Sequence, residues 1–274
     1  MKNIFNFILP LVFIVSCSME ESGDASTDTV EDRLSKVYYT EFMPCTAGPD
    51  YTSENMTSMI AEWQKLLTNE DLQGVWGYAP AVATNSFPDN GWWEIQWGSK
   101  EEAQEAWSEW SQNKEAAAWN EKYASVLQCD ESLINGFESV FPIASAQYSE
   151  LPDSGYFYGE VHICELNDGS TQEEAISFLS GFTEAVANAD YSDTSYHLGN
   201  YFNVDESGGF LWANFTNSEE SMNKANISFE ASVRETMFPI FSTFASCGEV
   251  PDLYHGFTLY NADDKDFMPT FPSN

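Results

Sequence analysis

Residues 91–102 read GWWEIQWGSKEE, and residues 209–220 read GFLWANFTNSEE. Each stretch starts with glycine, runs through aromatic and apolar residues, and ends in a polar segment with two glutamates. The cysteines around the first stretch recur around the second at nearly the same spacing, as Cys45 with Cys129 and Cys164 with Cys247. Two copies with so long a period indicate duplicated domains rather than a solenoid of short repeats.

Each copy shows the same order of predicted elements. A first strand rich in aromatic and β-branched residues precedes a helix whose apolar residues recur at helical spacing. Two strands joined by a turn follow, and then a second helix and a last strand. The strands are predicted at 37–45, 75–83, 92–97 and 134–141, and again at 156–164, 196–204, 210–215 and 254–260. The helices are predicted at 53–68 and 99–127, and at 172–188 and 217–244.

The second helix of each copy has a recognisable start. Ser99 precedes Glu102 with the spacing of a capping box, and Asn217 precedes Glu220 in the same way. Pro239 lies inside the later of these two helices, where proline removes a backbone donor and clashes with the preceding turn. We therefore expect a kink or a break in the helix near Pro239.

The element order strand, helix, strand, strand, helix, strand is that of the ferredoxin-like split βαβ unit. Its helices cover one face of a four-stranded antiparallel sheet, and the aromatic residues on the other face need a partner. We expect an α+β protein of two tandem ferredoxin-like repeats whose sheets pack face to face. This architecture resembles the dimeric α/β-barrel superfamily, which includes cofactor-independent monooxygenases, stress-responsive barrel proteins and haem-binding relatives. The resemblance covers 37–260 and depends on element order and duplication.

The N-terminal segment is typical of an exported protein. Lys2 precedes an apolar run that is too short to span a bilayer and matches a secretory signal. The run ends in a stretch that resembles a bacterial lipobox, which implies cleavage before Cys17 and attachment of lipid to it. Ser18 implies retention at the outer membrane, facing the periplasm of the bacterial cell envelope. The alternative is an ordinary signal peptide with an incidental cysteine.

These features divide the chain into predicted segments. An acidic Ser/Thr-rich stretch follows Cys17 and is typical of a flexible tether. The predicted segments are a signal peptide at 1–16, a lipidated tether at 17–35, a first repeat at 36–142, a linker at 143–155, a second repeat at 156–260 and a tail at 261–274.

The four remaining cysteines predict two disulfides. Export permits disulfide formation, and the duplication selects one pairing within each copy from the three possible connectivities. A metal site is the alternative, but the sequence has no CxxC or His-x3-His spacing. The predicted bridges are Cys45–Cys129 and Cys164–Cys247.

The charge of the chain excludes one class of partner. The sequence has 44 acidic and 10 basic residues, a formal net charge of −34. Phosphate backbones are bound by clustered lysine and arginine, so nucleic acid is not an expected partner. Solubility in a salty compartment explains the acidity most simply. Recruitment of a cation or a basic partner is the alternative.

The first strand of each copy carries the candidate catalytic residues. Alternation places Tyr39 and Glu41 on one face of the first copy, and Tyr158 and Glu160 on the same face of the second. If that face lined the barrel interior, burial would raise the carboxyl pKa and favour general acid or base chemistry. Alternatively, the face is partly wet or the glutamate accepts a hydrogen bond from tyrosine. The cysteine of each strand shares this face and must reach a segment that follows the second helix, which would instead place the face under the helices.

Histidines and tryptophans provide the candidate ligand-binding residues. His162, His197 and His255 could form a metal or haem site, but they are dispersed, so no metal or cofactor is expected. An aromatic-lined cavity would suit a planar or apolar ligand, and packed core rings are the alternative. The predicted ligand-binding residues are Trp76, Trp93, Trp97 and His162.

We therefore expect an exported lipoprotein that binds a small apolar or aromatic ligand in a cavity between the two sheets. A cofactor-independent oxygenase or isomerase that uses Glu41 or Glu160 as base is the second possibility. The third possibility is a structural or interaction lipoprotein without a pocket. The sequence has no nucleophile elbow, phosphate-cradling glycine loop or HExxH pattern.

Overall fold

A computed structural model describes residues 29–144, 147–149, 152–205 and 208–272. The predicted signal peptide and Cys17 lie outside the described residues. Among those that are described, no helix combines the length and apolar character needed to cross a membrane.

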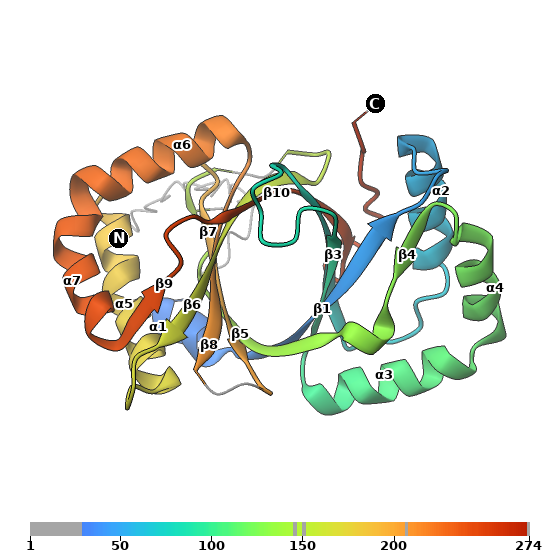
Figure 1. The fold of residues 1–274 in the computed structure, drawn as a ribbon, viewed down its shortest axis with the longest axis horizontal. Coiled ribbons are helices and arrows are strands. Elements are labelled where there is room, and N and C mark those ends of the chain that lie inside the picture. The colour runs from blue at the N-terminus through green and yellow to red at the C-terminus, as the bar shows by residue number, and fades with distance from the viewer. Residues whose placement is uncertain (1–28, 145–146, 150–151, 206–207, 273–274) are drawn as a thin grey trace, which may run out of the picture.

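Eight long antiparallel strands form a closed barrel in the middle of the molecule (Figure 1). Their order around the barrel is β10-β2-β3-β1-β5-β7-β8-β6, and β6 pairs with β10 to close it. The first-half strands are β1 (Tyr38–Ala47), β2 (Leu72–Pro80), β3 (Gly91–Trp97) and β5 (Asn135–Ile143). The second-half strands are β6 (Tyr156–Leu166), β7 (His197–Asn203), β8 (Gly209–Thr216) and β10 (Asp252–Asn261).

The two halves of the barrel are joined edge to edge. In the first half the strand order is β5-β1-β3-β2, and in the second it is β10-β6-β8-β7. The ladders β5–β7 and β10–β2 then connect the halves. The predicted facing sheets are therefore two sides of one continuous sheet. Closure pairs the strand edges that two separate sheets would leave open.

The helices lie outside the barrel in two groups on opposite sides (Figure 1). Each group covers the outer face of its own half. The first group comprises α2 (Ser53–Gln64), α3 (Lys100–Gln112) and α4 (Lys114–Tyr123). The second comprises α5 (Gln172–Ala187), α6 (Glu219–Ser228), a π-helical turn (Phe229–Val233) and α7 (Arg234–Phe244). The short helix α1 (Val30–Ser35) packs against β5 and α5.

The helix starts agree in part with the prediction. Ser99 caps α3 by accepting a hydrogen bond from the Glu102 backbone N–H. Ser218, and not Asn217, caps α6. Pro239 does not break α7, and the irregular turn lies before that helix, at Phe229–Val233.

The single helix predicted at 99–127 is divided at Asn113. The Asn113 side chain accepts hydrogen bonds from the backbone N–H groups of Glu115 and Ala116, at 2.9 and 3.3 Å. These bonds satisfy donors at the start of α4, so Asn113 ends one helix and begins the next.

Both predicted disulfides are present, Cys45–Cys129 and Cys164–Cys247. Two short strands that the sequence analysis missed, β4 (Leu127–Cys129) and β9 (Ala245–Cys247), make this pairing possible. They pair with the ends of β1 and β6 and place the two cysteines of each bridge directly opposite one another.

Alternation along the strands separates three apolar cores. On β1, Phe42 faces the barrel interior, whereas Met43 and Cys45 pack under the first group of helices. The second group of helices covers a similar core. The barrel interior itself is filled mainly by aromatic rings, those of Tyr78, Phe137, Phe157, Tyr201, Phe215 and Tyr254.

Candidate functional site

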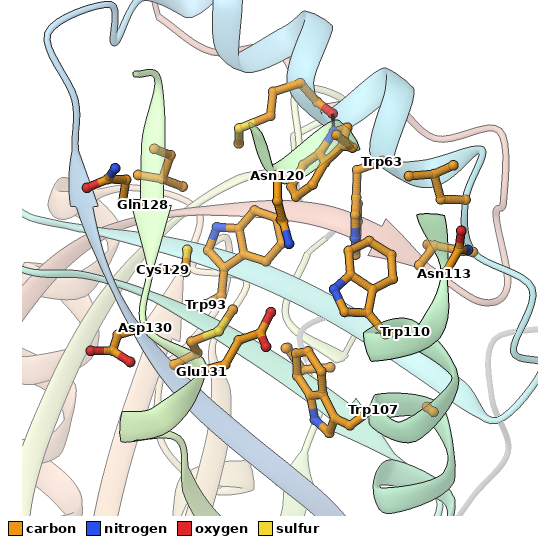
Figure 2. A pocket seen from close by; sticks show the side chains of 18 of the residues that line it. Trp63, Trp93, Trp107, Trp110, Asn113, Asn120, Gln128, Cys129, Asp130 and Glu131 are labelled. Carbon is orange, nitrogen blue, oxygen red and sulfur yellow. Dashed lines mark hydrogen bonds between the residues drawn. The ribbon is translucent and has the colours of Figure 1, made fainter. Parts of the chain in front are cut away.

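A cavity lies in the first half, between the outer face of the sheet and helices α2, α3 and α4. Its volume is about 720 Å³. Tryptophan rings form much of its wall (Figure 2). They come from β3, α2, α3 and α4, and are Trp63, Trp93, Trp97, Trp107, Trp110 and Trp119. We call this cavity the tryptophan pocket.

The position of these rings follows from the two periodicities of the chain. On β3, Trp93, Ile95 and Trp97 point outward toward the helices, and Trp92 points into the barrel, as strand alternation predicts. On α3, Trp107 and Trp110 are three residues apart and therefore lie on the same side of the helix. Sheet and helix thus present tryptophans to the same space.

Hydrogen bonds fix three of the indole rings. Trp97 Nε1 and Trp107 Nε1 both donate to Glu41 Oε2, at 3.0 and 2.7 Å. Trp119 Nε1 donates to the Met59 carbonyl oxygen at 3.0 Å. These donors are used within the wall of the pocket, and the ring surfaces remain for contact with a ligand.

Ring contacts support the wall further. The Trp63 and Trp93 centroids are 5.2 Å apart in an edge-to-face arrangement. Trp110 of α3 meets Trp119 of α4 at 6.1 Å, also edge to face. The second contact joins the two helices across the break at Asn113, so it supports the outer wall of the cavity.

Glu41 lies under the helices and not in the barrel interior. It shares its strand face with Cys45, and the disulfide to β4 holds that face outward. The side chain is 5% exposed. Burial raises the pKa of Glu41, while the hydrogen bonds from Trp107 and Trp97 pull it down. Glu41 therefore anchors two rings of the pocket from behind.

Glu160 occupies the equivalent place in the second half. Its carboxylate accepts hydrogen bonds from Asn214 Nδ2 at 3.1 Å and Asn226 Nδ2 at 2.9 Å, and contacts His162 Nε2 at 3.2 Å. Burial opposes its ionisation, but the bonds from His162 and Asn226 outweigh burial and hold the pKa of Glu160 below its usual value. Asn226 of α6 thus plays the part that Trp107 of α3 plays in the first half.

The predicted tyrosine–glutamate pairs are not the contacts that form. The described partners of both glutamates are indole, amide and imidazole groups. Burial, and then the charge of Glu41, raises the pKa of Tyr39 to about 12. Burial likewise raises the pKa of Tyr158. At neutral pH both hydroxyl groups stay protonated.

In the second half, aromatic rings pack into the space that corresponds to the tryptophan pocket. Phe182 meets Trp212 at 4.9 Å, and Phe241 of α7 meets Trp212 at 5.8 Å. Phe178 and Phe244 lie 5.2 Å apart beside them. The two halves are alike in topology but differ in how this space is filled.

The three histidines lie apart. His162 contacts Glu160, and His255 bonds to Tyr156. His197 stacks on Phe141, and burial lowers its pKa to about 4. In the described part of the chain, no three His, Cys, Asp or Glu side chains group as metal ligands.

The tryptophan pocket does not fit a haem. Haem iron is held by an axial histidine, cysteine thiolate or tyrosine, or by methionine together with histidine. None of the described lining residues is a histidine or tyrosine, and Cys129 is tied in a disulfide.

The barrel interior contains a polar group that the sequence analysis missed. Glu94 lies on β3 between the outward-facing Trp93 and Ile95, so alternation turns it inward, and it is 2% exposed. The Tyr78 hydroxyl donates a hydrogen bond to its carboxylate, and Tyr201 lies beside it. Burial raises the pKa of Glu94 to about 7, although both tyrosines favour the ionised form. A glutamate at an inward position of an aromatic strand is the signal that could have identified it.

A smaller cavity of about 200 Å³ lies above this group, at one end of the barrel. Tyr78, Tyr201 and Ala213 line it. Trp76, one of the predicted ligand-binding residues, also faces the interior. The inter-sheet space that we expected to hold the ligand is thus largely filled by rings, and the larger cavity lies on the outer face, where Trp93 and Trp97 point.

No protein-family profile matches the sequence, and no curated protein matches it. Solved structures do match the fold. An anthrone oxidase-like protein aligns over 87% of this chain and 97% of its own, with 13% identity and a TM-score of 0.50. A candidate monooxygenase from Lactobacillus acidophilus NCFM aligns over 81% and 94%, with 8% identity and a TM-score of 0.48. Chlorite dismutase from Candidatus Nitrospira defluvii aligns over 84% and 95%, with 14% identity and a TM-score of 0.46.

These neighbours are dimeric α/β-barrel proteins. The strand pairing and the match to the anthrone oxidase-like structure confirm the predicted α+β fold with a closed antiparallel barrel. At such low sequence identity the similarity concerns the fold, and function has to be argued from the site.

Proposed function

We propose that this protein is an exported, lipid-anchored binding protein for a small, mostly apolar or aromatic molecule. The tryptophan pocket is the proposed binding site. The observation that carries the proposal is a cavity of about 720 Å³ walled by tryptophans, a volume within the range of small-molecule sites. We further propose that the chain is a tandem of ferredoxin-like repeats, of which the first has kept an open pocket.

The arrangement of the wall supports binding rather than a purely structural role. Trp107, Trp110 and Trp119 are only partly buried, although tryptophan gains more than most residues from full burial. Their rings border open space and are held by hydrogen bonds and ring contacts. A ligand that fills this space would bury the exposed ring surface, and the wall would need little rearrangement.

A matched pair of variants tests the binding site. Trp110→Ala removes a wall ring, and Phe229→Ala removes the ring at the corresponding position of the second half. The probes are two-ring molecules, the neutral 1-methylnaphthalene and the cation N-methylquinolinium, and isothermal titration calorimetry measures their binding. We expect one probe to bind saturably to the wild type, at least about tenfold more weakly to Trp110→Ala, and unchanged to Phe229→Ala. Saturable binding of neither probe would refute the proposal.

The lipid anchor is proposed from the sequence around Cys17. Metabolic labelling with radioactive palmitate in a bacterial host should mark the wild type and leave Cys17→Ser unlabelled. The labelled protein should fractionate with the outer membrane. Labelling that persists in Cys17→Ser would contradict lipidation at this residue.

An enzyme of the cofactor-independent oxygenase or isomerase type is the second candidate. The observation that favours it is Glu41, a buried carboxyl with a raised pKa directly behind Trp97 and Trp107. Such a group suits proton transfer. Glu41→Gln should then abolish turnover of a bound substrate and retain its binding. Glu160→Gln, in the half with the filled space, is the matched control. Equal turnover by both variants would exclude Glu41 as the base.

A further inference from the structure

We propose that the tryptophan pocket selects positively charged ligands, and that its natural ligand is an organic cation with a quaternary or aromatic ammonium group. This inference rests on the proposed function, because it concerns the same pocket. It adds the sign of the ligand's charge, which an apolar cavity alone does not determine.

The wall offers ring surfaces, and three of its six indole N–H donors are already used within the protein. The N–H groups of Trp97 and Trp107 are bound to Glu41, and that of Trp119 is bound to the Met59 carbonyl oxygen. A ligand that relies on accepting hydrogen bonds cannot use these three donors. The faces of aromatic rings carry the negative part of the quadrupole and attract cations, and tryptophan attracts them most strongly.

The ionisable side chains that line the pocket have one sign. Glu109, Asp130 and Glu131 are the ionisable side chains among its described lining residues, and none of those residues is lysine, arginine or histidine. Figure 2 shows the Glu131 carboxylate directed toward the tryptophan rings. The other polar lining groups labelled there are neutral amides, those of Asn113, Asn120 and Gln128.

The charge of the whole chain acts in the same direction. A net charge of −34 produces a negative potential that concentrates cations and repels anions before contact. Inside the pocket, an anion would face the rim carboxylates without a basic partner, whereas a cation would be attracted by rim and rings alike. The pocket therefore discriminates by charge as well as by shape.

A pair of isosteric probes separates charge from shape. N-methylquinolinium and 1-methylnaphthalene have the same two-ring outline and differ by one positive charge. The neutral compound is the more hydrophobic of the two, so hydrophobic burial alone would favour it. In titration calorimetry at low salt we expect the cation to bind at least about tenfold more tightly. Raising the salt concentration should weaken the binding of the cation and leave the affinity for the neutral compound nearly unchanged.

A rim variant tests the origin of the selectivity. Glu131→Gln keeps the size of the side chain and removes its charge. We expect a loss of about three- to tenfold in affinity for N-methylquinolinium and no change for 1-methylnaphthalene. Glu173→Gln, at an exposed position on α5 of the second half, is the control and should change neither affinity.

The outcomes distinguish this inference from the proposed function. Equal or tighter binding of 1-methylnaphthalene would overturn the charge selectivity and leave the pocket as a site for neutral aromatic ligands. An equal loss of both affinities in Glu131→Gln would assign that residue a structural role and also overturn it. Saturable binding of neither probe would count against the binding site itself.

Discussion

Tyr78 and Tyr201 occupy equivalent positions in the two halves of the barrel, and both lie beside the carboxylate of Glu94, to which the Tyr78 hydroxyl donates a hydrogen bond. Tyr78 pairs with Trp92 on β3, and Tyr201 pairs with Leu211 on β8. At the place on β8 that corresponds to Glu94 stands Ala213. The Glu94 carboxyl therefore lies between two tyrosines at equivalent positions, and Ala213 gives the second half no counterpart to it.

Glu94 should make stability depend on pH. Its pKa is about 7 in the folded protein, above the ordinary value of 4.5, so the folded state binds more protons between these values. Stability should then fall as pH rises from about 4.5 to 7, by up to about 3 kcal/mol. Glu94→Gln should remove this part of the dependence. Urea unfolding of both proteins at pH 5 and 7.5 measures it.

The contradicting result is a difference between wild type and Glu94→Gln that is the same at both pH values. Glu160→Gln is the control, and its effect on stability should be the same at pH 5 and pH 7.5. Because the pKa of Glu160 is lowered in the folded protein, its contribution should be full above pH 4.5 and be lost as the pH falls through the lowered pKa.

Trp107→Phe should destabilise the protein, because it removes a hydrogen bond to the Glu41 carboxylate. The variant keeps a ring in the wall but removes one of the two indole donors to a buried carboxylate. We expect a loss of about 1–3 kcal/mol in the free energy of unfolding, measured by chemical denaturation. Trp110→Phe is the matched control on the same helix, because the indole of Trp110 is not among the donors to Glu41. An equal loss in both variants would show that the hydrogen bond to Glu41 is not the cause.

Loss of either disulfide should destabilise the protein, but only one loss should affect the pocket. Each bridge closes a loop of 83 or 84 residues, and its removal should cost about 4 kcal/mol in the chain-entropy model. Cys129 lines the tryptophan pocket. Replacing Cys45 and Cys129 by serine should therefore also weaken N-methylquinolinium binding.

The double replacement of Cys164 and Cys247 provides the comparison, because that bridge lies in the other half. It should reduce stability by a similar amount and leave probe affinity unchanged under conditions where the protein stays folded. A similar drop in affinity for both double variants would mean that the first bridge has no special effect on the pocket.

Much of the architecture was readable from the sequence because each pattern in the first half of the chain recurs in the second half. Alternation placed Trp93 and Trp97 on one face of β3, and the cysteine spacing indicated the bridges. We expected that face to line the space between the sheets, whereas it points outward to the helices. The short strands β4 and β9 were missed because three residues carry no periodic signal. The break at Asn113 was missed because the apolar pattern continues across it, and the preference of asparagine for helix starts became clear only with its bonds in place.

The location of the pocket could not be predicted for a different reason. The sequence pattern is nearly the same in both halves, whereas the cavity depends on what differs. Trp107 stands where the second half has Asn226. In the second half, Phe241 of α7 packs on Trp212 of the sheet, and Phe244 packs beside it. Such a difference is decided by three-dimensional packing. We expected the ligand between the sheets because strand alternation does not show how completely rings fill a barrel.

The ladders β5–β7 and β10–β2 each pair a strand of the first half with a strand of the second, so the stability of each half depends on the other. If the halves separated, the backbone N–H and C=O groups of β5, β7, β10 and β2 at these ladders would be unpaired. Each half therefore protects the strand edges of the other from pairing with further copies of the chain. Expressed as two polypeptides, the halves should find each other and behave as a heterodimer. The residues around the cavity of one half could then change in sequence while the strands of the other half still close the barrel.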